Sequence, residues 1–195
     1  MGKEFELKYA ATAAQLALLK QRYPHLRPIA METAYYDNAA GDFSRLKWTF
    51  RRRMENEKSI CTLKTPTQGL GRAEFETECG DLMAAVPQLI ALGAPAQLLA
   101  LVADGIAESC GAKFTRLAGL LELPGCTAEL ALDEGVLLGG GKELPFREVE
   151  VELKEGSEEA VIAFAEALAA ELGLVPEHKS KVARARALAE CRMQN

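Results

Sequence analysis

Glu4-Phe5-Glu6-Leu7-Lys8, close to the N-terminus, is the stretch of sequence on which the predicted fold depends. In a β-strand, residues two positions apart share a face and lie roughly 6.6–7 Å apart. Two carboxylates and an ammonium would therefore line one face, while the two apolar residues line the other. Carboxylates at this spacing can hold a hard divalent cation, and a cation beside a lysine favours a polyanionic ligand. The alternative is a half-buried edge strand with a solvated charged face.

Length and composition restrict the class of protein. The chain has 195 residues, 49% of them apolar, which predicts a single domain over residues 1–195 with a sizeable core. The formal net charge of −5 does not favour nucleic acid as a partner. The sequence shows no signal-like N-terminal segment and no apolar run long enough to span a bilayer. We therefore expect a cytoplasmic protein with no membrane partner.

Cysteine and histidine usage argues against zinc. The cysteines are odd in number and lack C-x-x-C spacing, which predicts reduced thiols rather than a disulfide framework. His25 and His178 are the only histidines of the sequence, so catalysis centred on histidine is disfavoured. A metal held by oxygen ligands is favoured over zinc for the same reason.

Turn and capping residues divide the rest of the chain into helices and strands. Thr12, with Gln15 three residues later, predicts a capping box at the start of the first helix. Helices are expected over residues 12–23, 81–92, 96–103, 157–172 and 181–192. Strands are expected over residues 29–38, 46–54, 58–64, 72–79, 106–116, 117–122, 127–137 and 146–154. About nine strands with helices inserted in blocks predict an antiparallel α+β domain with a large sheet or a closed barrel.

Several later strands repeat the alternation of charged and apolar residues. Glu148, Glu150 and Glu152 share one face of a strand, as do Arg51 and Arg53. The same pattern recurs in two further sets: Glu129 and Asp133, and Arg72, Glu74 and Glu76. The helices need apolar strand faces to cover, so in a closed sheet the charged faces would point into the bore. Such a bore is electrostatically costly when empty, and a metal ion with a polyanion would neutralise both sets of charges.

An ordered set of motifs carries a family resemblance. After the opening stretch come Tyr35-Tyr36-Asp37, Phe50-Arg51-Arg52-Arg53, Thr62-Leu63-Lys64, Arg72 with Glu74 and Glu76, Arg116, Asp133-Glu134-Gly135, Glu148 with Glu150 and Glu152, and Ser180-Lys181. In this order the chain resembles the CYTH domain family, the triphosphate tunnel metalloenzymes, nearly from end to end. That family includes inorganic triphosphatases, thiamine triphosphatases and class IV adenylyl cyclases. The resemblance implies an eight-stranded antiparallel β-barrel, the triphosphate tunnel, with helices packed outside.

The resemblance also implies a role for each matching residue. Mg²⁺ or Mn²⁺ would be held by carboxylates, for which the candidates are Glu4, Glu6, Asp133, Glu150 and Glu152. Phosphate oxygens would be bound by Lys8, Arg51, Arg53, Lys64, Arg72, Arg116 and Lys181. Arginine can bind phosphate through two nitrogens, whereas lysine acts as a point charge. The catalytic candidates are Lys8, Glu148 and Glu150, of which the glutamates would orient the attacking water.

The predicted function is metal-dependent hydrolysis of a small-molecule triphosphate. Inorganic tripolyphosphate is the first candidate, because the long segment 135–145 resembles the bacterial inorganic triphosphatase branch rather than the class IV cyclases. The alternatives are a class IV-type adenylyl cyclase, a thiamine triphosphatase, and a polyphosphate- or nucleotide-binding module without turnover. The sequence leaves open whether the protein forms a homodimer.

Some residues have simpler interpretations. Arg52 replaces a hydrophobic residue of the family, which predicts a place at a rim or in an ion pair. Gly139-Gly140-Gly141 lacks the context of a phosphate loop and predicts a flexible turn. Trp48 predicts packing, and the alternation of Tyr35 and Tyr36 predicts that one faces the bore and the other the helices. The basic residues Lys179, Arg184 and Arg186 predict a solvated helix face, with Lys181 reaching the tunnel.

Overall fold

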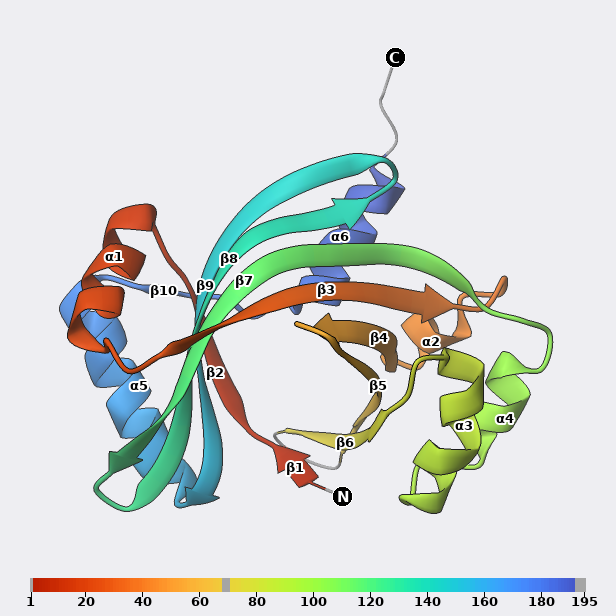
Figure 1. The fold of residues 1–195 in the computed structure, drawn as a ribbon, viewed down its shortest axis with the longest axis horizontal. Helices are drawn as coiled ribbons and strands as arrows, with labels where there is room; N and C mark the ends of the chain where they lie inside the picture. Colours follow the sequence, from red (N-terminus) through yellow and green to blue (C-terminus); the bar gives the residue numbers. More distant parts are fainter. Residues whose placement is uncertain (1, 68–70, 192–195) are drawn as a thin grey trace.

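The computed structural model describes residues 2–67 and 71–191, with side chains from residue 5 onward. Within these ranges, ten strands form one antiparallel sheet against which six helices lie (Figure 1). The strands are β1 (Gly2–Glu4), β2 (Glu6–Ala10), β3 (Arg27–Asp37), β4 (Thr49–Glu55), β5 (Lys58–Pro66), β6 (Arg72–Glu78), β7 (Ala107–Leu123), β8 (Cys126–Gly139), β9 (Lys142–Gly156) and β10 (Val175–Pro176). The helices are α1 (Ala13–Arg22), α2 (Asp42–Arg45), α3 (Leu82–Ala91), α4 (Gln97–Val102), α5 (Glu158–Leu172) and α6 (Lys181–Glu190).

The N-terminal segment joins the two halves of the sheet. The strand order is β1-β6-β5-β4-β3-β7-β8-β9-β2-β10. Only Phe5 separates β1 from β2 in the chain, yet β1 pairs with β6 and β2 pairs with β9. The predicted α+β class and antiparallel sheet are confirmed. The predicted closed eight-stranded barrel is not confirmed. The hydrogen-bonded sheet does not close on itself, because the chain changes its pairing strand from β6 to β9 at Phe5.

The helices begin at the capping residues that the sequence indicates. Thr12 and Gln15 form the predicted capping box, in which the backbone N–H of Gln15 donates to Thr12 Oγ1 at 3.2 Å. The side chains of Asp81 and Ser157 accept hydrogen bonds from the first turns of α3 and α5. Gly173 ends α5 at a φ of 69°, a conformation that glycine adopts without strain. These caps are local in sequence, which is why the helix starts could be predicted.

Two predictions about the long strands are wrong. β7 is one strand of 17 residues, because every residue from Gly111 to Leu123 pairs with β8 and none interrupts the ladder. Residues 138–145, which lie between the two predicted strands 127–137 and 146–154, also belong to the sheet, since they form the paired ends of β8 and β9 and the turn between them. These strands meet in a two-residue turn at Gly140-Gly141, where φ is 58° and 72°. Such a turn requires positive φ at both positions, which favours glycine.

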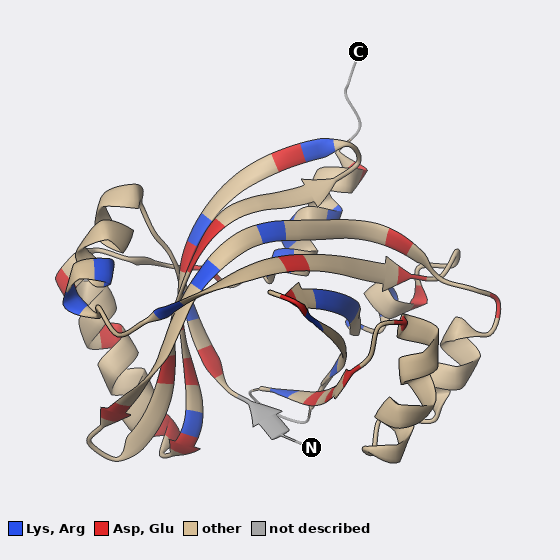
Figure 2. Ribbon diagram, viewed as in Figure 1, with Lys and Arg blue, Asp and Glu red and all other residues tan. Residues whose placement is uncertain are grey.

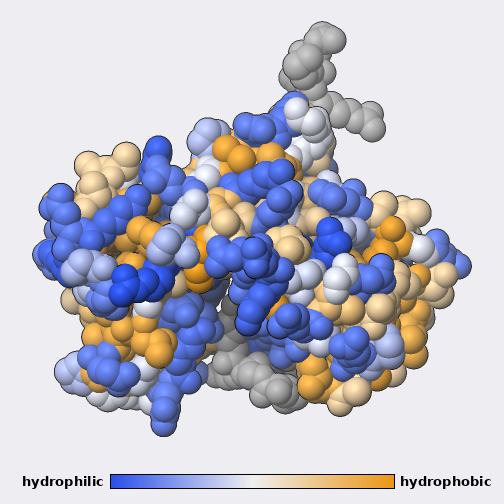
Figure 3. Space-filling model, in the orientation of Figure 1, coloured by the Kyte–Doolittle hydropathy of each residue, from blue (hydrophilic) through white to orange (hydrophobic). Residues whose placement is uncertain are grey.

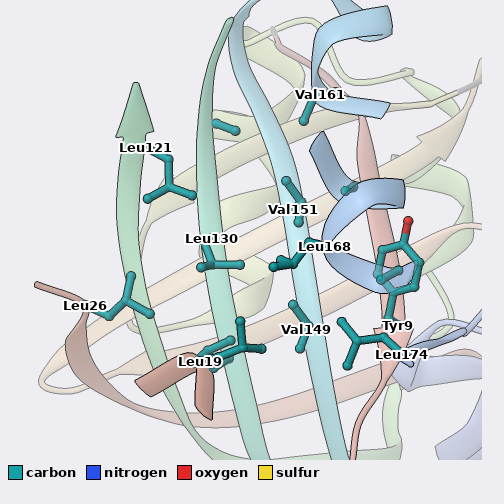
Figure 4. Packing of buried hydrophobic residues seen from close by; sticks show 14 of the residues in the cluster. Tyr9, Leu19, Leu26, Leu121, Leu130, Val149, Val151, Val161, Leu168 and Leu174 are labelled. Atoms are coloured by element: carbon teal, nitrogen blue, oxygen red, sulfur yellow. The ribbon is translucent and has the colours of Figure 1, made fainter. Parts of the chain in front are cut away.

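Apolar strand faces pack against the helices and turn the charged faces inward. Leu130, Val149 and Val151 point toward α5, where Leu168 lies among them (Figure 4). A second core joins β4, β5 and β6 to α2, α3 and α4, and it includes Trp48, whose ring centroid lies 6.4 Å from that of Phe43. The predicted packing role of Trp48 is therefore confirmed. A third cluster lies between α6 and the strands β3, β7, β8 and β9.

The surface reflects this division. Figure 2 shows Lys, Arg, Asp and Glu along the strands that curve around the centre, whereas α3 and α4 carry none of them. In Figure 3, hydrophilic residues cover the middle of the face, and hydrophobic residues gather at the lower right, over α3 and α4. None of the described helices has the length and apolar composition that crossing a bilayer would need.

Candidate functional site

The inward faces of β2 to β9 and the start of α6 line a cavity of about 310 Å³. Most of the predicted site residues meet there: Glu6, Lys8, Arg51, Arg53, Lys64, Arg72, Arg116, Glu150, Glu152 and Lys181. Asp133 and Glu148 are fully buried and contact the cavity-lining Lys181. The side chain of Glu4 lies outside the described residues. Strands far apart in the sequence thus bring nearly the whole predicted set together.

The two tyrosines of the Tyr-Tyr-Asp motif face opposite ways. Tyr35 lines the cavity and is 3% exposed. Tyr36 packs against the core under α3 and α4. The predicted alternation is confirmed. Asn38, which stands in the next loop, donates to Asp42 Oδ2 at 2.9 Å and to the carbonyl of Leu101 at 3.1 Å, so this loop ties α2 to α4.

One wall of the cavity has a small basic excess: among the described residues, β4, β5 and β6 contribute four bases and three acids to its lining. We call it the basic wall. Arg51 and Arg53 stand two residues apart on β4, with Lys64 on the neighbouring strand β5. Glu74 on β6 partly neutralises this wall, since its Oε1 lies 3.3 Å from Lys64 Nζ and 3.6 Å from Arg51 Nη2. Burial raises the pKa of the Glu74 carboxyl, but the nearby Lys64 and Arg51 lower it more, so the carboxylate is ionised.

Arg53 is an incompletely satisfied cation of the basic wall. It pairs with Glu55, but its buried Nε has no hydrogen-bond partner among the described residues. Burial, and next the positive charge of Arg51, lower the pKa of Arg53. Both effects mean that the guanidinium is held in surroundings that disfavour its charge. An anion in the cavity would supply the missing acceptor.

The opposite wall is acidic and is organised by strand register. Glu6 on β2 stands opposite Glu152 on β9, and Glu152 stands opposite Glu129 on β8. All three line the cavity. Two residues further along β2, Lys8 stands opposite Glu150 of β9. Because side chains of facing residues on neighbouring strands lie close together, three carboxylates form a row across this wall.

Beneath the cavity lies a buried ionic cluster of three acids and three bases: Asp133, Glu148 and Glu150 with Arg116, Lys181 and Arg184. The Lys181 ammonium occupies its centre, 2.8 Å from Asp133 Oδ2 and 2.6 Å from oxygens of Glu148 and Glu150. Arg116 donates to both Asp133 oxygens, at 2.8 and 2.7 Å, and also to Glu150. Arg184 pairs with Glu148. The formal charges of the cluster therefore cancel.

The cluster keeps its members charged despite their burial. Burial favours the neutral form of Glu150, but Lys181 and Arg116 hold its pKa well below the usual range. Burial likewise favours neutral Lys181, but Asp133, Glu150 and Glu148 raise its pKa above the usual lysine value. The rings of Phe114 and Phe146 flank the ammonium, with centroids 5.3 and 5.4 Å from Nζ. Aromatic faces attract a cation at this distance.

Some parts of the site were missed or misplaced by sequence reasoning. The prediction of a solvated basic face on the last helix is wrong for Arg184 and Arg186, whose side chains are only 15% and 16% exposed. A signal for Arg184 was present, because residues three apart share a helix face and Arg184 stands three after Lys181. Lys154 and Glu129 also line the cavity, and no motif had marked Lys154. Arg52 is partly exposed and donates to the carbonyl of Gly80 at 3.1 Å.

Three carboxylates of the cluster could in principle hold a metal ion. Oxygens of Asp133, Glu148 and Glu150 lie within 4.8 Å of one another. The Lys181 ammonium takes the central position among them, however. The carboxylates Glu6, Glu150 and Glu152 line the cavity itself. Carboxylate oxygens are the ligands that Mg²⁺ and Mn²⁺ prefer, so these residues suit either ion by ligand type, although among the described residues their oxygens do not gather within 4.8 Å of one another.

Comparison with known proteins agrees with this geometry. A family model described as the CYTH domain matches residues 2–185. The Hippeastrum protein HpAC1, a proposed adenylyl cyclase reported to have a dominant triphosphatase activity, is 21% identical, with a TM-score of 0.70 over 94% of this chain and 95% of its own. A proposed adenylate cyclase from Bacillus halodurans is 18% identical, with a TM-score of 0.68 over 94% and 98%. A Pyrococcus horikoshii protein is 24% identical, with a TM-score of 0.61 over 97% and 99%. These structures share the fold of this chain.

Proposed function

Because the chain belongs to the CYTH domain family, we propose that it is a metal-dependent enzyme that hydrolyses a triphosphate, with inorganic tripolyphosphate as the first candidate. One observation carries this proposal: a basic wall and a row of carboxylates face each other across one cavity of about 310 Å³. A polyanion alone would satisfy only the basic wall, and a cation alone only the acidic row. A metal–triphosphate complex satisfies both.

The basic residues would bind the phosphate chain. Arg53 offers a buried nitrogen without a partner among the described residues. Arg51 stands two residues before it on β4, and Lys64 lies near Arg51, with which it shares Glu74. Each charge-assisted hydrogen bond to phosphate contributes roughly 1.5–3 kcal/mol. Phosphoryl transfer needs mainly positioning and charge stabilisation from the protein, which such a wall of fixed cations supplies.

The carboxylates that line the cavity would hold the metal ion. We assign Glu6, Glu150 and Glu152 to it, and the family resemblance adds Glu4. When bound, Mg²⁺ or Mn²⁺ neutralises phosphate oxygens during the transfer. We give Asp133 a supporting role, because it is fully buried and, unlike Glu150, is not among the residues that line the cavity.

Glu150 is the stronger candidate for orienting the attacking water. It lines the cavity, while Glu148 is fully buried and holds Lys181 and Arg184. A carboxylate whose pKa is held low is a weak base but a reliable hydrogen-bond acceptor. Glu150 would therefore position the water rather than remove its proton early. Lys8, opposite Glu150 in the register, would contact the phosphate under attack.

The test is phosphate release from tripolyphosphate, thiamine triphosphate and ATP, each with Mg²⁺ or Mn²⁺. We expect the fastest turnover with tripolyphosphate, loss of metal-dependent turnover in Glu6→Gln, and weaker substrate binding in Lys8→Ala. Lys113→Ala is the matched control, since this exposed lysine pairs with Glu32 outside the cavity. If the wild-type protein releases phosphate from none of the three, the enzymatic proposal is wrong. Tight calorimetric binding without product would instead assign a binding module, and cyclic AMP with pyrophosphate from ATP would assign a cyclase.

A further inference from the structure

Two lysines stand among carboxylates at this site, and they differ in how firmly they are held. Lys181 is 9% exposed and contacts three carboxylates at 2.6–2.8 Å. The side chain of Lys154 is 36% exposed; its Nζ lies 2.8 Å from Glu152 Oε2 and 3.8 Å from Glu129 Oε1. The first lysine is locked in the buried ionic cluster, whereas the second lies at the more exposed side of the cavity.

Lys154 stands on the carboxylate row. It follows Glu152 by two residues on β9, so both side chains share the inward face, and both line the cavity. Glu129 and Glu152, which it contacts, face each other in the register between β8 and β9. Lys154 therefore supplies positive charge to Glu152, one of the carboxylates that we assign to the metal, and to Glu129 next to it.

The burial of the two lysines decides which one a cation could displace. Removing one partner from a buried ion pair leaves an uncompensated charge, which is strongly destabilising. A partly exposed pair is screened by water, and its loss has a small effect. A divalent cation also carries twice the charge of an ammonium, so it competes well for the partly exposed carboxylates of Glu129 and Glu152. Lys154 can leave its partners at little cost, whereas Lys181 cannot.

We propose that Lys154 is a displaceable counter-ion: it neutralises Glu129 and Glu152 in the metal-free protein, leaves them when the metal binds, and then contacts the phosphate chain of the substrate. This inference rests on the proposed function. Its consequence is that Lys154 opposes binding of the metal alone and favours binding of the metal–triphosphate complex. The lysine thereby makes the two ligands bind together rather than one by one.

The experiment uses the full chain and the variant Lys154→Met, which keeps a long side chain but removes the charge. Calorimetric titration with Mn²⁺ in the absence of substrate measures the first effect. We expect Mn²⁺ to bind Lys154→Met roughly fivefold or more tightly than the wild type, the factor that about 1 kcal/mol represents. The apparent Kd of the Mn²⁺–tripolyphosphate complex, measured with the carboxylates loaded, should rise by a similar factor.

Two further variants separate a charge effect from a structural one. Lys154→Arg keeps the charge and should return both affinities toward the wild-type values. Lys113→Met removes an exposed, ion-paired lysine outside the cavity and should change neither affinity. If Mn²⁺ binds Lys154→Met with wild-type or weaker affinity while the wild type hydrolyses tripolyphosphate, the counter-ion role is wrong and the proposed function stands. If the wild type neither binds Mn²⁺ nor hydrolyses a triphosphate, both are wrong.

Discussion

Replacing Lys181 with methionine removes the central cation of the buried ionic cluster and tests whether the cluster balances its own charge. Within the cluster, three acids would then be paired with two bases, Arg116 and Arg184. Asp133 and Glu148 are 0% exposed and Glu150 is 7% exposed, so water solvates the excess negative charge poorly. Methionine fits between the rings of Phe114 and Phe146, because its thioether contacts aromatic rings favourably. The expected loss of stability is therefore electrostatic rather than steric.

The size of the destabilisation follows from how the extra negative charge can be neutralised. One glutamate can bind a proton, and for an ordinary carboxyl of pKa about 4.3 this costs about 1.36 × (7 − 4.3), or about 3.7 kcal/mol, at pH 7. That value agrees with the range of about 3–5 kcal/mol for breaking a buried pair. At pH 5 the same arithmetic gives about 1 kcal/mol. The folded variant binds one proton more than its unfolded state, so its stability falls as pH rises.

Urea denaturation of the wild type and of Lys181→Met at pH 5, 6 and 7 measures this dependence. The difference in the free energy of unfolding should shrink from about 4 kcal/mol at pH 7 to about 1 kcal/mol at pH 5. Adding Glu148→Gln removes one acid, so the double variant should regain most of the loss at pH 7. A destabilisation below about 1 kcal/mol that does not change with pH would refute the charge balance of the cluster.

Further predictions concern the basic wall, pH and the turn between β8 and β9. Arg53→Ala should weaken tripolyphosphate binding roughly 10- to 100-fold by calorimetry without lowering the free energy of unfolding; unchanged affinity would remove Arg53 from the phosphate site. The pKa values of Glu74 and Glu150 are held low in the fold, so their stabilisation is complete above the unfolded pKa of about 4.3. This stabilisation should be lost as pH falls below that value. A free energy of unfolding in urea at pH 3 equal to that at pH 6 would contradict this prediction. Gly139→Ala should lower stability by about 1–3 kcal/mol in urea, because its new β-carbon would overlap the carbonyl oxygen of Ala185 in α6.

Alternation along the strands made much of the site predictable. The two-residue period places Glu150 beside Glu152, and Arg51 beside Arg53, whatever the strand order. Which wall these side chains form depends on pairing between distant segments, such as Glu6 with Glu152. Register of this kind is a long-range property that one strand does not encode. The residue types and their inward faces were therefore predictable, whereas their partners were not.

The basic residues of α6 show a second limit of prediction from the sequence. When segment 179–186 is considered alone, its four basic residues, Lys179, Lys181, Arg184 and Arg186, predict a solvated face. The close approach of Gly139 and Gly140 to Ala185 and Ala189 lets the helix pack directly on the hairpin, which covers Arg184 and carries Lys181 into the cluster. The three glycines were interpreted as a flexible turn, because neither segment alone shows that they meet. Their small size matters for packing as well as for the turn.

The contrast between the two groups of charges explains how the site can be stable and still need a ligand. The buried ionic cluster pairs each acid with a base, so it has no electrostatic need of a metal ion or an anion. The basic wall is different: Arg51 and Arg53 lie two residues apart on β4, and the positive charge of Arg51 adds to burial in lowering the pKa of Arg53. A further carboxylate beside Arg53 would add stability but would compete with an anion for it. A neutral cluster beneath an unbalanced wall therefore confines the electrostatic strain to the surface that faces the cavity, where a bound triphosphate would relieve it.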